Sequence, residues 1–516
     1  MSVIRKILSN IVLSRITRAV NEFLSLGQHA YRAGRSTTEV VWTAQWLVAT
    51  AEKYGERIHI MALDLSKAFD NLDRGTLIQI LEENSLAGED ELRIISYLVS
   101  ETTLKVKVGK NISETFKTTI GTPQGDALSP VLFLIYLEHI LRRHRRRNLL
   151  SMNEYEMSYA DDIHFATKDA DLRRGIQHRR ERNYTYRPGC QCAACRAKEI
   201  ENTMPTDMAV DKMQCNGGKT VHVEFEPATA RKTAFEILGN NTNPNLEIVK
   251  RRGNAIKAFA GLIRIWTRRS DISTELKMKL YNAIVKPHLT YNAAASAYTG
   301  TQVEALNRIH RRQLRRLLNV HYPEHISNAE VYERTKAYPI SIDIAKMRWS
   351  FFGHVLRQPR DTPANTVMRN YFKRKELDGD EERERTKRSW CLTTVPRLLQ
   401  LDLNSISDND KKTFFGGAIQ LSGGYDLVQL TNKAQYRHNW KKAVEKIRAA
   451  EESKWRGKET ERLATKAAKE AAAALERSRA AAALTRSRAA AAAVAERPRT
   501  RSQTTLMRYF GNTNLS

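Results

Sequence analysis

The sequence predicts an α+β fold that is followed by a mostly helical second half. Over residues 1–246, segments with apolar residues at helical spacing alternate with short strand-like runs. Two of those runs end in carboxylates. From about residue 247 to 360 the pattern is almost entirely helical and rich in Arg and aromatic residues. Together these observations favour a ferredoxin-like antiparallel sheet backed by helices, joined to a helical region.

The elements follow one another in a regular order. Apolar residues at helical spacing predict helices over 1–24 and 37–54. Residues 58–65 are strand-like, 74–84 and 90–100 are helical, and 103–108 with 114–120 form an expected hairpin. A long helix is expected over 128–143, and the apolar run 157–165 predicts a strand, a turn and a second strand.

The last third is strongly charged. Residues 373–412 predict loops, and beyond 440 the chain is rich in Ala, Arg, Lys and Glu, with a near-repeat that begins at Arg477 and again at Arg486. Alanine favours helix, but no large apolar residues accompany it. We therefore expect a basic, partly helical and otherwise disordered arm over 441–502.

Composition narrows the class of protein. The 516 residues carry a formal net charge of +28, which indicates a polyanionic partner, most simply nucleic acid. No apolar run is long enough for a membrane span, so no membrane partner is expected. Five cysteines in so long a chain argue against a secreted disulfide scaffold. Residues 1–21 hold Arg and Ser but no acid, so a mitochondrial transit peptide is an alternative to a helix of the fold.

Two acidic segments carry the expected chemistry. Asp161 and Asp162 follow Tyr159 and Ala160 in one apolar run, and Asp64 ends an upstream strand. Adjacent carboxylates repel one another unless a cation lies between them, and Mg²⁺ prefers a few carboxylates with phosphate oxygens. We expect a two-Mg²⁺ phosphoryl-transfer site with Asp64 and Asp161 as bridging ligands and Asp162 as an outer one. An Asp-rich surface turn is the alternative.

Several segments, in order, resemble motifs A to E of reverse transcriptases. They are Asp64–Asp70, Gly121–Pro130, Tyr159–Asp162, Asn216–Thr220 and Ile237–Gly239. Gln28–Thr37 resembles the finger segment of non-LTR (LINE-like) retrotransposon enzymes, which favours a finger helix over a transit peptide for residues 1–24. More loosely, the helical region to about 365 resembles their thumb and post-thumb regions.

The resemblance implies a right-hand polymerase. Fingers and a ferredoxin-like palm would occupy 1–246, a helical thumb 247–300 and a helical post-thumb region 301–440. Its implied activity is RNA-directed DNA synthesis, which extends a DNA 3′ end on an RNA template. Implied partners are RNA template, DNA primer or target and deoxynucleoside triphosphates, and the implied location is the nucleus with a possible cytoplasmic stage.

The resemblance also assigns roles to single residues. Phe69 would exclude ribonucleotides at the sugar 2′ position, Gln124 and Gly125 would contact the base and template, and Lys219 would lie beside the leaving pyrophosphate. Arg32 and Arg35 would contact template or primer phosphate, with a helix-cap and solvent role as the alternative. Ser36 or Thr37 is expected to cap that helix. The basic runs 142–147 and 310–316 are candidates for phosphate contact.

One departure bears on activity. The family carries further finger sequence ahead of the part that resembles residues 1–24, including basic residues that grip the triphosphate. We therefore expect an N-terminally truncated relative. A catalytically inactive remnant that binds nucleic acid and a sliding clamp is the alternative function.

Cysteines gather in an expected insertion over about 171–215. Cys190, Cys192 and Cys195 suit Zn²⁺ thiolate ligation, with Cys215, His178 or His222 as a fourth ligand. A reduced-thiol loop is the alternative.

A short motif lies near the end of the sequence. Gln503, Leu506, Tyr509 and Phe510, within 503–510, resemble the box that docks on the eukaryotic sliding clamp, PCNA. The sequence therefore predicts a clamp partner.

Overall fold

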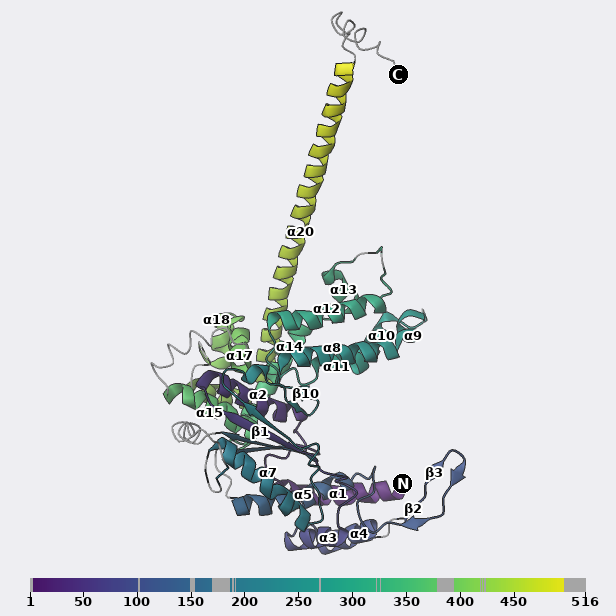
Figure 1. The fold of residues 1–516 in the computed structure, drawn as a ribbon, viewed down its shortest axis with the longest axis vertical. Coiled ribbons are helices and arrows are strands. Elements are labelled where there is room, and N and C mark those ends of the chain that lie inside the picture. Colours follow the sequence, from purple (N-terminus) through teal and green to yellow (C-terminus); the bar gives the residue numbers. More distant parts are fainter. Residues whose placement is uncertain are drawn as a thin grey trace, which may run out of the picture. The chain divides into compact units, whose positions relative to one another are not determined.

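The computed structural model describes residues 3–100, 103–148, 154–168, 186–187, 190, 192–268, 271–321, 323–324, 326–377, 394–417, 419, 421 and 424–495. The chain divides into two compact units, Met1–Glu451 and Glu452–Ser516. The first unit holds all the strands and most of the helices (Figure 1). The finer boundaries predicted at 246, 300 and 440 stay predictions.

A four-stranded antiparallel sheet lies at the centre of the first unit. Its strands are β1 (Ile58–Leu63), β6 (Glu154–Tyr159), β7 (Asp162–Lys168) and β8 (Val221–Phe225), in the order β6-β7-β1-β8. Helices α3 (Arg74–Glu83), α4 (Glu89–Ser100) and α5 (Ser129–Asn148) separate β1 from β6 in the chain, and α7 (Ala193–Val210) precedes β8. This order is the split β-α-β scheme that the sequence predicted as ferredoxin-like.

Both faces of the sheet are covered. On β1, Ile58 and Ile60 enter one apolar cluster, while Met61 and Leu63 enter another, because successive side chains point to opposite faces. The first cluster includes residues of α2 (Thr37–Tyr54) and α15 (Pro363–Leu377); the second includes residues of α1 (Val3–Phe23), α5 and α7. Figure 1 shows α1, α5 and α7 on one side of the sheet.

Short elements connect the larger ones. β2 (Thr103–Leu104) pairs with β5 (Phe116–Lys117), and β3 (Lys107–Val108) pairs with β4 (Asn111–Ile112), so the expected hairpin is confirmed in two separate pieces. A 3₁₀ turn, Ala230–Lys232, precedes the pair β9 (Glu236–Ile237) and β10 (Asn240–Asn241).

The predicted helical region is confirmed. It comprises α8 (Pro244–Gly261), α9 (Ile263–Arg268), α10 (Thr274–Leu280), a π-helical turn (Tyr281–Val285), α11 (Lys286–Thr290), α12 (Gly300–Leu317), α13 (Asn328–Thr335) and α14 (Ile340–Arg357).

One sequence-based expectation for the last third is wrong in the residues that the structure describes. Within 373–412, predicted as loops, the chain forms α17 (Val395–Asn404) and α18 (Asp408–Phe415). Thr394 caps the first helix through Arg397 N, and Leu399 and Phe415 are buried, so capping and burial outweigh the charged composition. α19 (Gly424–Gln435) follows.

The predicted arm is a continuous helix through its described part. α20 runs from Arg437 to Ala495. Its first turns belong to the core of the first unit, because Trp440, Val444 and Ile447 are buried there. The alanine-rich remainder is helical because alanine loses the least entropy in a helix. Among the described helices, none is both long and apolar enough to cross a membrane.

Candidate active site

Three carboxylates lie at one end of the neighbouring strands β1 and β7. Asp64 follows the last residue of β1, Asp161 lies in the β6–β7 turn and Asp162 begins β7. Leu63 pairs with Ile163, so the antiparallel register places Asp64 opposite Asp162. Burial raises the pKa of Asp162, and the charges of Asp161 and Asp64 raise it further. The structure therefore brings together the three acids that the sequence singled out.

The turn that carries Asp161 is held by a buried glutamine from a distant segment. Ala160 has a left-handed backbone with a φ of 57°. The Gln28 side-chain oxygen accepts hydrogen bonds from Ala160 N and from Ala30 N, both at 3.0 Å, and Gln28 Nε2 donates to Ala160 O at 3.4 Å. Gln28 is therefore a positioning residue for the acidic turn.

Backbone bonds attach the same segment to β6. Ser158 N donates to Gly27 O at 2.8 Å, and His29 N donates to Ser158 O at 2.9 Å. A Cβ on Gly27 would lie 2.5 Å from Glu156 O, so this approach requires glycine. Sequence reasoning included Gln28 in a family segment but gave it no role, because nothing local indicates a partner 132 residues away.

Lys219 reaches the acidic end of β1, as the sequence predicted. The turn that contains it is tied to the strand by a bond from Asn216 N to Asp64 O at 2.7 Å. Lys219 Nζ lies 3.5 Å from Asp64 Oδ2, and the lysine side chain is 69% exposed. The ammonium group is therefore beside the acids and also open to a ligand from solvent.

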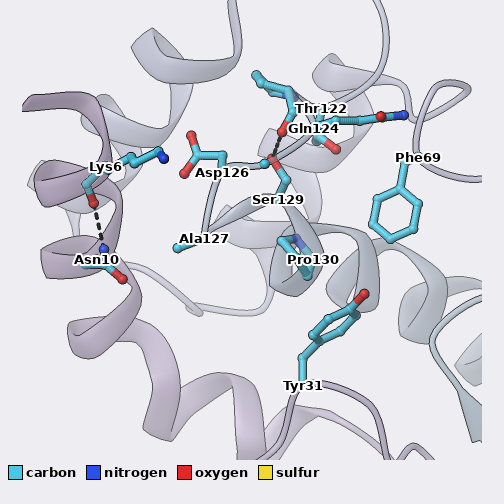
Figure 2. A pocket seen from close by; sticks show the side chains of 12 residues that line it. Lys6, Asn10, Tyr31, Phe69, Thr122, Gln124, Asp126, Ala127, Ser129 and Pro130 are labelled. Carbon is cyan, nitrogen blue, oxygen red and sulfur yellow. Dashed lines mark hydrogen bonds between the residues drawn. The ribbon is translucent and has the colours of Figure 1, made fainter. Parts of the chain in front are cut away.

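A pocket of about 470 Å³ lies next to Phe69. Figure 2 shows Lys6 and Asn10 of α1 on the side of this pocket opposite Phe69. The segment 122–130 and Tyr31 complete the lining. The Phe69 ring is held against Phe133, with ring centroids 4.4 Å apart, so its orientation is set by packing. Lys6 and Tyr31 are wall residues that the sequence did not single out.

Tyr31 joins this pocket to the carboxylates. It has a φ of 53° and is 54% exposed. Burial raises the pKa of its hydroxyl, and the charges of Asp161 and then Tyr159 raise it further. The phenol therefore stays protonated near the acids and can donate a hydrogen bond to a ligand.

Gln124 and Gly125 are both exposed on the pocket's edge. The loop that carries them is anchored at Gly121, which has a φ of 76° and donates from its N–H to Leu72 O at 2.8 Å. A Cβ on Gly121 would lie 2.9 Å from Asp70 O. Buried Arg74 donates to Gly121 O at 2.8 Å. These contacts leave Gln124 exposed at the surface, and its contact with a base or template stays a prediction.

Arg32 has a structural role in this geometry. Its guanidinium donates to Ser25 O at 2.6 Å, to Gln28 O at 3.0 Å and to Asn21 O at 3.0 Å. These bonds fix the segment that presents Gln28. These internal bonds differ from the helix-cap and solvent role that was the alternative, and the phosphate contact stays a prediction.

Arg35 is also engaged within the chain. Its Nη1 lies 3.0 Å from Glu39 Oε2, and its side chain is 10% exposed. Glu39 also contacts His29 and, on α14, His354, at 2.9 and 3.0 Å. Burial alone would raise the pKa of Glu39, but the contacts with His29 and His354 outweigh it and hold the pKa far below its ordinary range. Ser36 occupies the N-cap position of α2 without a side-chain capping bond.

The basic runs differ in what they expose. In 142–147, Arg143 pairs with Asp211, Arg145 with Glu156, and buried His144 with Asp207 at 2.8 Å, so much of this charge is neutralised internally. On α12, Arg308, Arg312 and Arg316 are exposed at intervals of four residues and share one helix face. We call these three residues the arginine stripe.

The remaining predicted residues lie elsewhere. Cys190, Cys192 and Cys195 form one cluster, and Cys215 is not a member of it. Cys215 instead bridges Leu65, next to Asp64, and burial raises the pKa of its thiol to about 11. Gln503, Leu506, Tyr509, Phe510 and His178 lie outside the described residues.

Comparison with known proteins gives one family match and several similar structures. Residues 1–187 match the family model described as reverse transcriptase (RNA-dependent DNA polymerase). Apo telomerase from Candida tropicalis is 11% identical with a TM-score of 0.39, over 70% of this chain and 55% of that chain. Telomerase from Candida albicans with a TWJ fragment of telomeric RNA is 11% identical with a TM-score of 0.36, over 65% of this chain and 56% of that chain.

The chain thus spans about half the length of the telomerases that it matches, and these TM-scores are too low to support a conclusion. The family match is of a different kind, because it covers the stretch that holds Asp64, Asp161 and Asp162. Residues 1–187 are therefore similar to reverse transcriptase domains.

Proposed function

We propose that this chain is the RNA-directed DNA polymerase of a LINE-like, non-LTR retroelement. It would extend a DNA 3′ end on an RNA template by two-metal nucleotidyl transfer. The observation that carries this proposal is the meeting of Asp64, Asp161 and Asp162 at one end of β1 and β7, with Lys219 3.5 Å from Asp64.

The acids fit the implied metal. Carboxylate oxygens on neighbouring strands, partly open to solvent, are the donors that Mg²⁺ takes together with substrate phosphates. Asp64, Asp161 and Asp162 would hold the two ions, which would supply charge neutralisation and activation of the attacking hydroxyl. Lys219 would stabilise charge or donate a proton at the leaving pyrophosphate. Phe69, fixed against Phe133, would close on the sugar 2′ position.

Primer extension on poly(rA)/oligo(dT) with deoxythymidine triphosphate and Mg²⁺ tests the activity. Asp161→Asn should lower the rate by about 10³-fold or more, since the metals contribute several kcal/mol of transition-state stabilisation. Asp90→Asn, an exposed acid on α4, is the matched control and should extend at the wild-type rate. A wild-type chain that binds primer–template but adds no nucleotide would instead support the inactive remnant.

The arginine stripe supports nucleic acid as the partner. Four residues of α-helix rise about 6 Å, which is close to the distance between successive phosphates along a strand. Replacing Arg308, Arg312 and Arg316 by Gln should weaken primer–template binding and lower the slope of log Kd against log salt by about two to three. The matched control replaces Arg18, Arg93 and Arg334, exposed arginines that already pair with acids. An unchanged slope in the stripe variant would exclude this contact.

We also propose that 503–510 docks on the sliding clamp, which agrees with a nuclear location. The support is the sequence pattern of Gln503, Leu506, Tyr509 and Phe510 alone. Tyr509→Ala with Phe510→Ala should abolish pulldown by the clamp, while Asn512→Ala with Asn514→Ala should leave it intact. Equal pulldown by both variants would refute the motif.

A further inference from the structure

A cluster of three thiols lies apart from the candidate active site, at the start of α7. The Sγ atoms of Cys190, Cys192 and Cys195 lie within 4.8 Å of one another. Cys192 is the N-cap of α7, and its Sγ accepts from Cys195 N at 3.4 Å. Arg187 N donates to Cys195 Sγ at 3.4 Å, so a backbone N–H is directed at the cluster from the chain that precedes it.

This spacing suits one tetrahedral soft cation. A Zn–S bond of about 2.3 Å places thiolates about 3.8 Å apart around the metal, so the thiols need only a small inward rotation. Sulfur ligands select zinc over magnesium or calcium. On binding, the thiol protons leave to solvent and three thiolates face the ion.

The structure also limits which residue completes the site. Cys215 bridges Leu65 beside Asp64 and is not a member of the thiol cluster. The Nε2 atom of His222 lies 3.1 Å from His59 Nδ1 and is already engaged. Two of the three fourth ligands expected from the sequence are therefore not members of the cluster, and the third, His178, lies outside the described residues.

The cluster adjoins the sheet that carries the acids. Thr167 Oγ1, on β7, donates to Ala193 O in the first turn of α7 at 2.8 Å. Further along α7, Ile200 and Met204 are fully buried in the apolar cluster that also contains Met61 and Leu63 of β1. A metal at the start of α7 would therefore fix this helix against the strands that end in Asp64 and begin with Asp162.

We propose that Cys190, Cys192 and Cys195 bind one structural Zn²⁺ that anchors the start of α7 against the sheet. The proposal does not depend on polymerase activity, because its evidence is the thiol geometry and the packing of α7. It also assigns the cluster a structural role, since none of the three thiols lines the pocket beside Phe69.

Metal analysis of the purified full chain tests the site. We expect about one equivalent of zinc, released by a thiol-reactive mercurial, and thiolate-to-metal charge-transfer absorption when Co²⁺ replaces Zn²⁺. Cys190→Ser, at a half-buried position, should lose most of the metal. Cys215→Ser should keep it. Less than about a tenth of an equivalent in the wild type would overturn the proposal.

Stability provides a second measurement in case the serine variant folds poorly. Chelation of wild-type protein should lower Tm by several degrees, and added Zn²⁺ should restore it, because a ligand that binds only the folded state stabilises it. Cys215→Ser should show the same chelator response as wild type. A Tm that does not respond to chelation, or zinc content that falls equally in Cys215→Ser, would contradict the assignment.

Discussion

Gln28→Ala tests how the acidic turn is positioned. The substitution removes the acceptor of two buried backbone donors, Ala30 N and Ala160 N. A buried donor without a partner costs about 1–3 kcal/mol, so the pair costs about 2–6 kcal/mol if the turn keeps its shape. A shift of the turn would also relieve the left-handed conformation of Ala160, which costs about 1–2 kcal/mol. The turn should therefore shift and carry Asp161 with it.

The expected result is a loss of rate that exceeds the loss of binding. A displacement of about 1 Å at a reacting group can cost about 10²-fold, so we expect a fall of that order at saturating Mg²⁺. Primer–template affinity should change little, because the Gln28 side chain is buried and cannot contact the duplex directly. Tm should fall by a few degrees.

Two variants serve as comparisons. Gln28→Glu keeps an oxygen that can accept both hydrogen bonds but replaces the donor to Ala160 O by a buried acceptor, so it should also lose stability. Gln79→Ala, at an exposed position of α3, controls for loss of a glutamine side chain. Single-turnover primer extension over a Mg²⁺ series and thermal unfolding by circular dichroism provide the readouts. A Gln28→Ala protein with wild-type Tm and wild-type rate would refute the reasoning.

Three further predictions follow from the geometry. Gly121→Ala should lower both the stability and the extension rate more than Gly125→Ala does. Both glycines have positive φ, but only Gly121 lacks room for a Cβ. Equal effects of the two substitutions would show that crowding at the Cβ is irrelevant. Arg32→Lys should lower Tm while leaving the salt dependence of primer–template binding unchanged, since its bonds are internal; a changed salt slope with normal Tm would favour phosphate contact. Because the folded pKa of Glu39 lies below its unfolded value of about 4.3, the unfolded chain binds more protons as pH falls through that value and stability decreases. Glu39→Gln should therefore show a smaller Tm change between about pH 6 and pH 4 than wild type, measured in the same buffers.

The local sequence pattern was sufficient to predict most helices and strands of the first 360 residues and the three acids of the candidate site. The spacing of apolar residues predicted α1, α2, β1 and the β6–β7 turn. Each of these segments buries a regularly spaced set of apolar side chains. The pairing of Asp64 with Asp161 and Asp162 was also predictable, since adjacent carboxylates at strand ends have few stable uses without a cation. By contrast, α17 and α18 were missed because their few buried residues lie in a charged stretch.

Residue types indicate which chemistry to expect of this chain, whereas the packing of distant segments sets where the reactive groups lie. Residue type fixes what a side chain can ligate or donate, so the acids, Lys219 and the cysteines were visible at once. Contacts between residues far apart in the chain decide three points that the residue types leave open. They decide whether Arg32 binds a phosphate or backbone oxygens of this chain, whether Cys215 joins the thiol cluster, and which side chain holds Ala160. Those contacts arise only when sheet register and helix packing bring distant segments together, which no local pattern encodes.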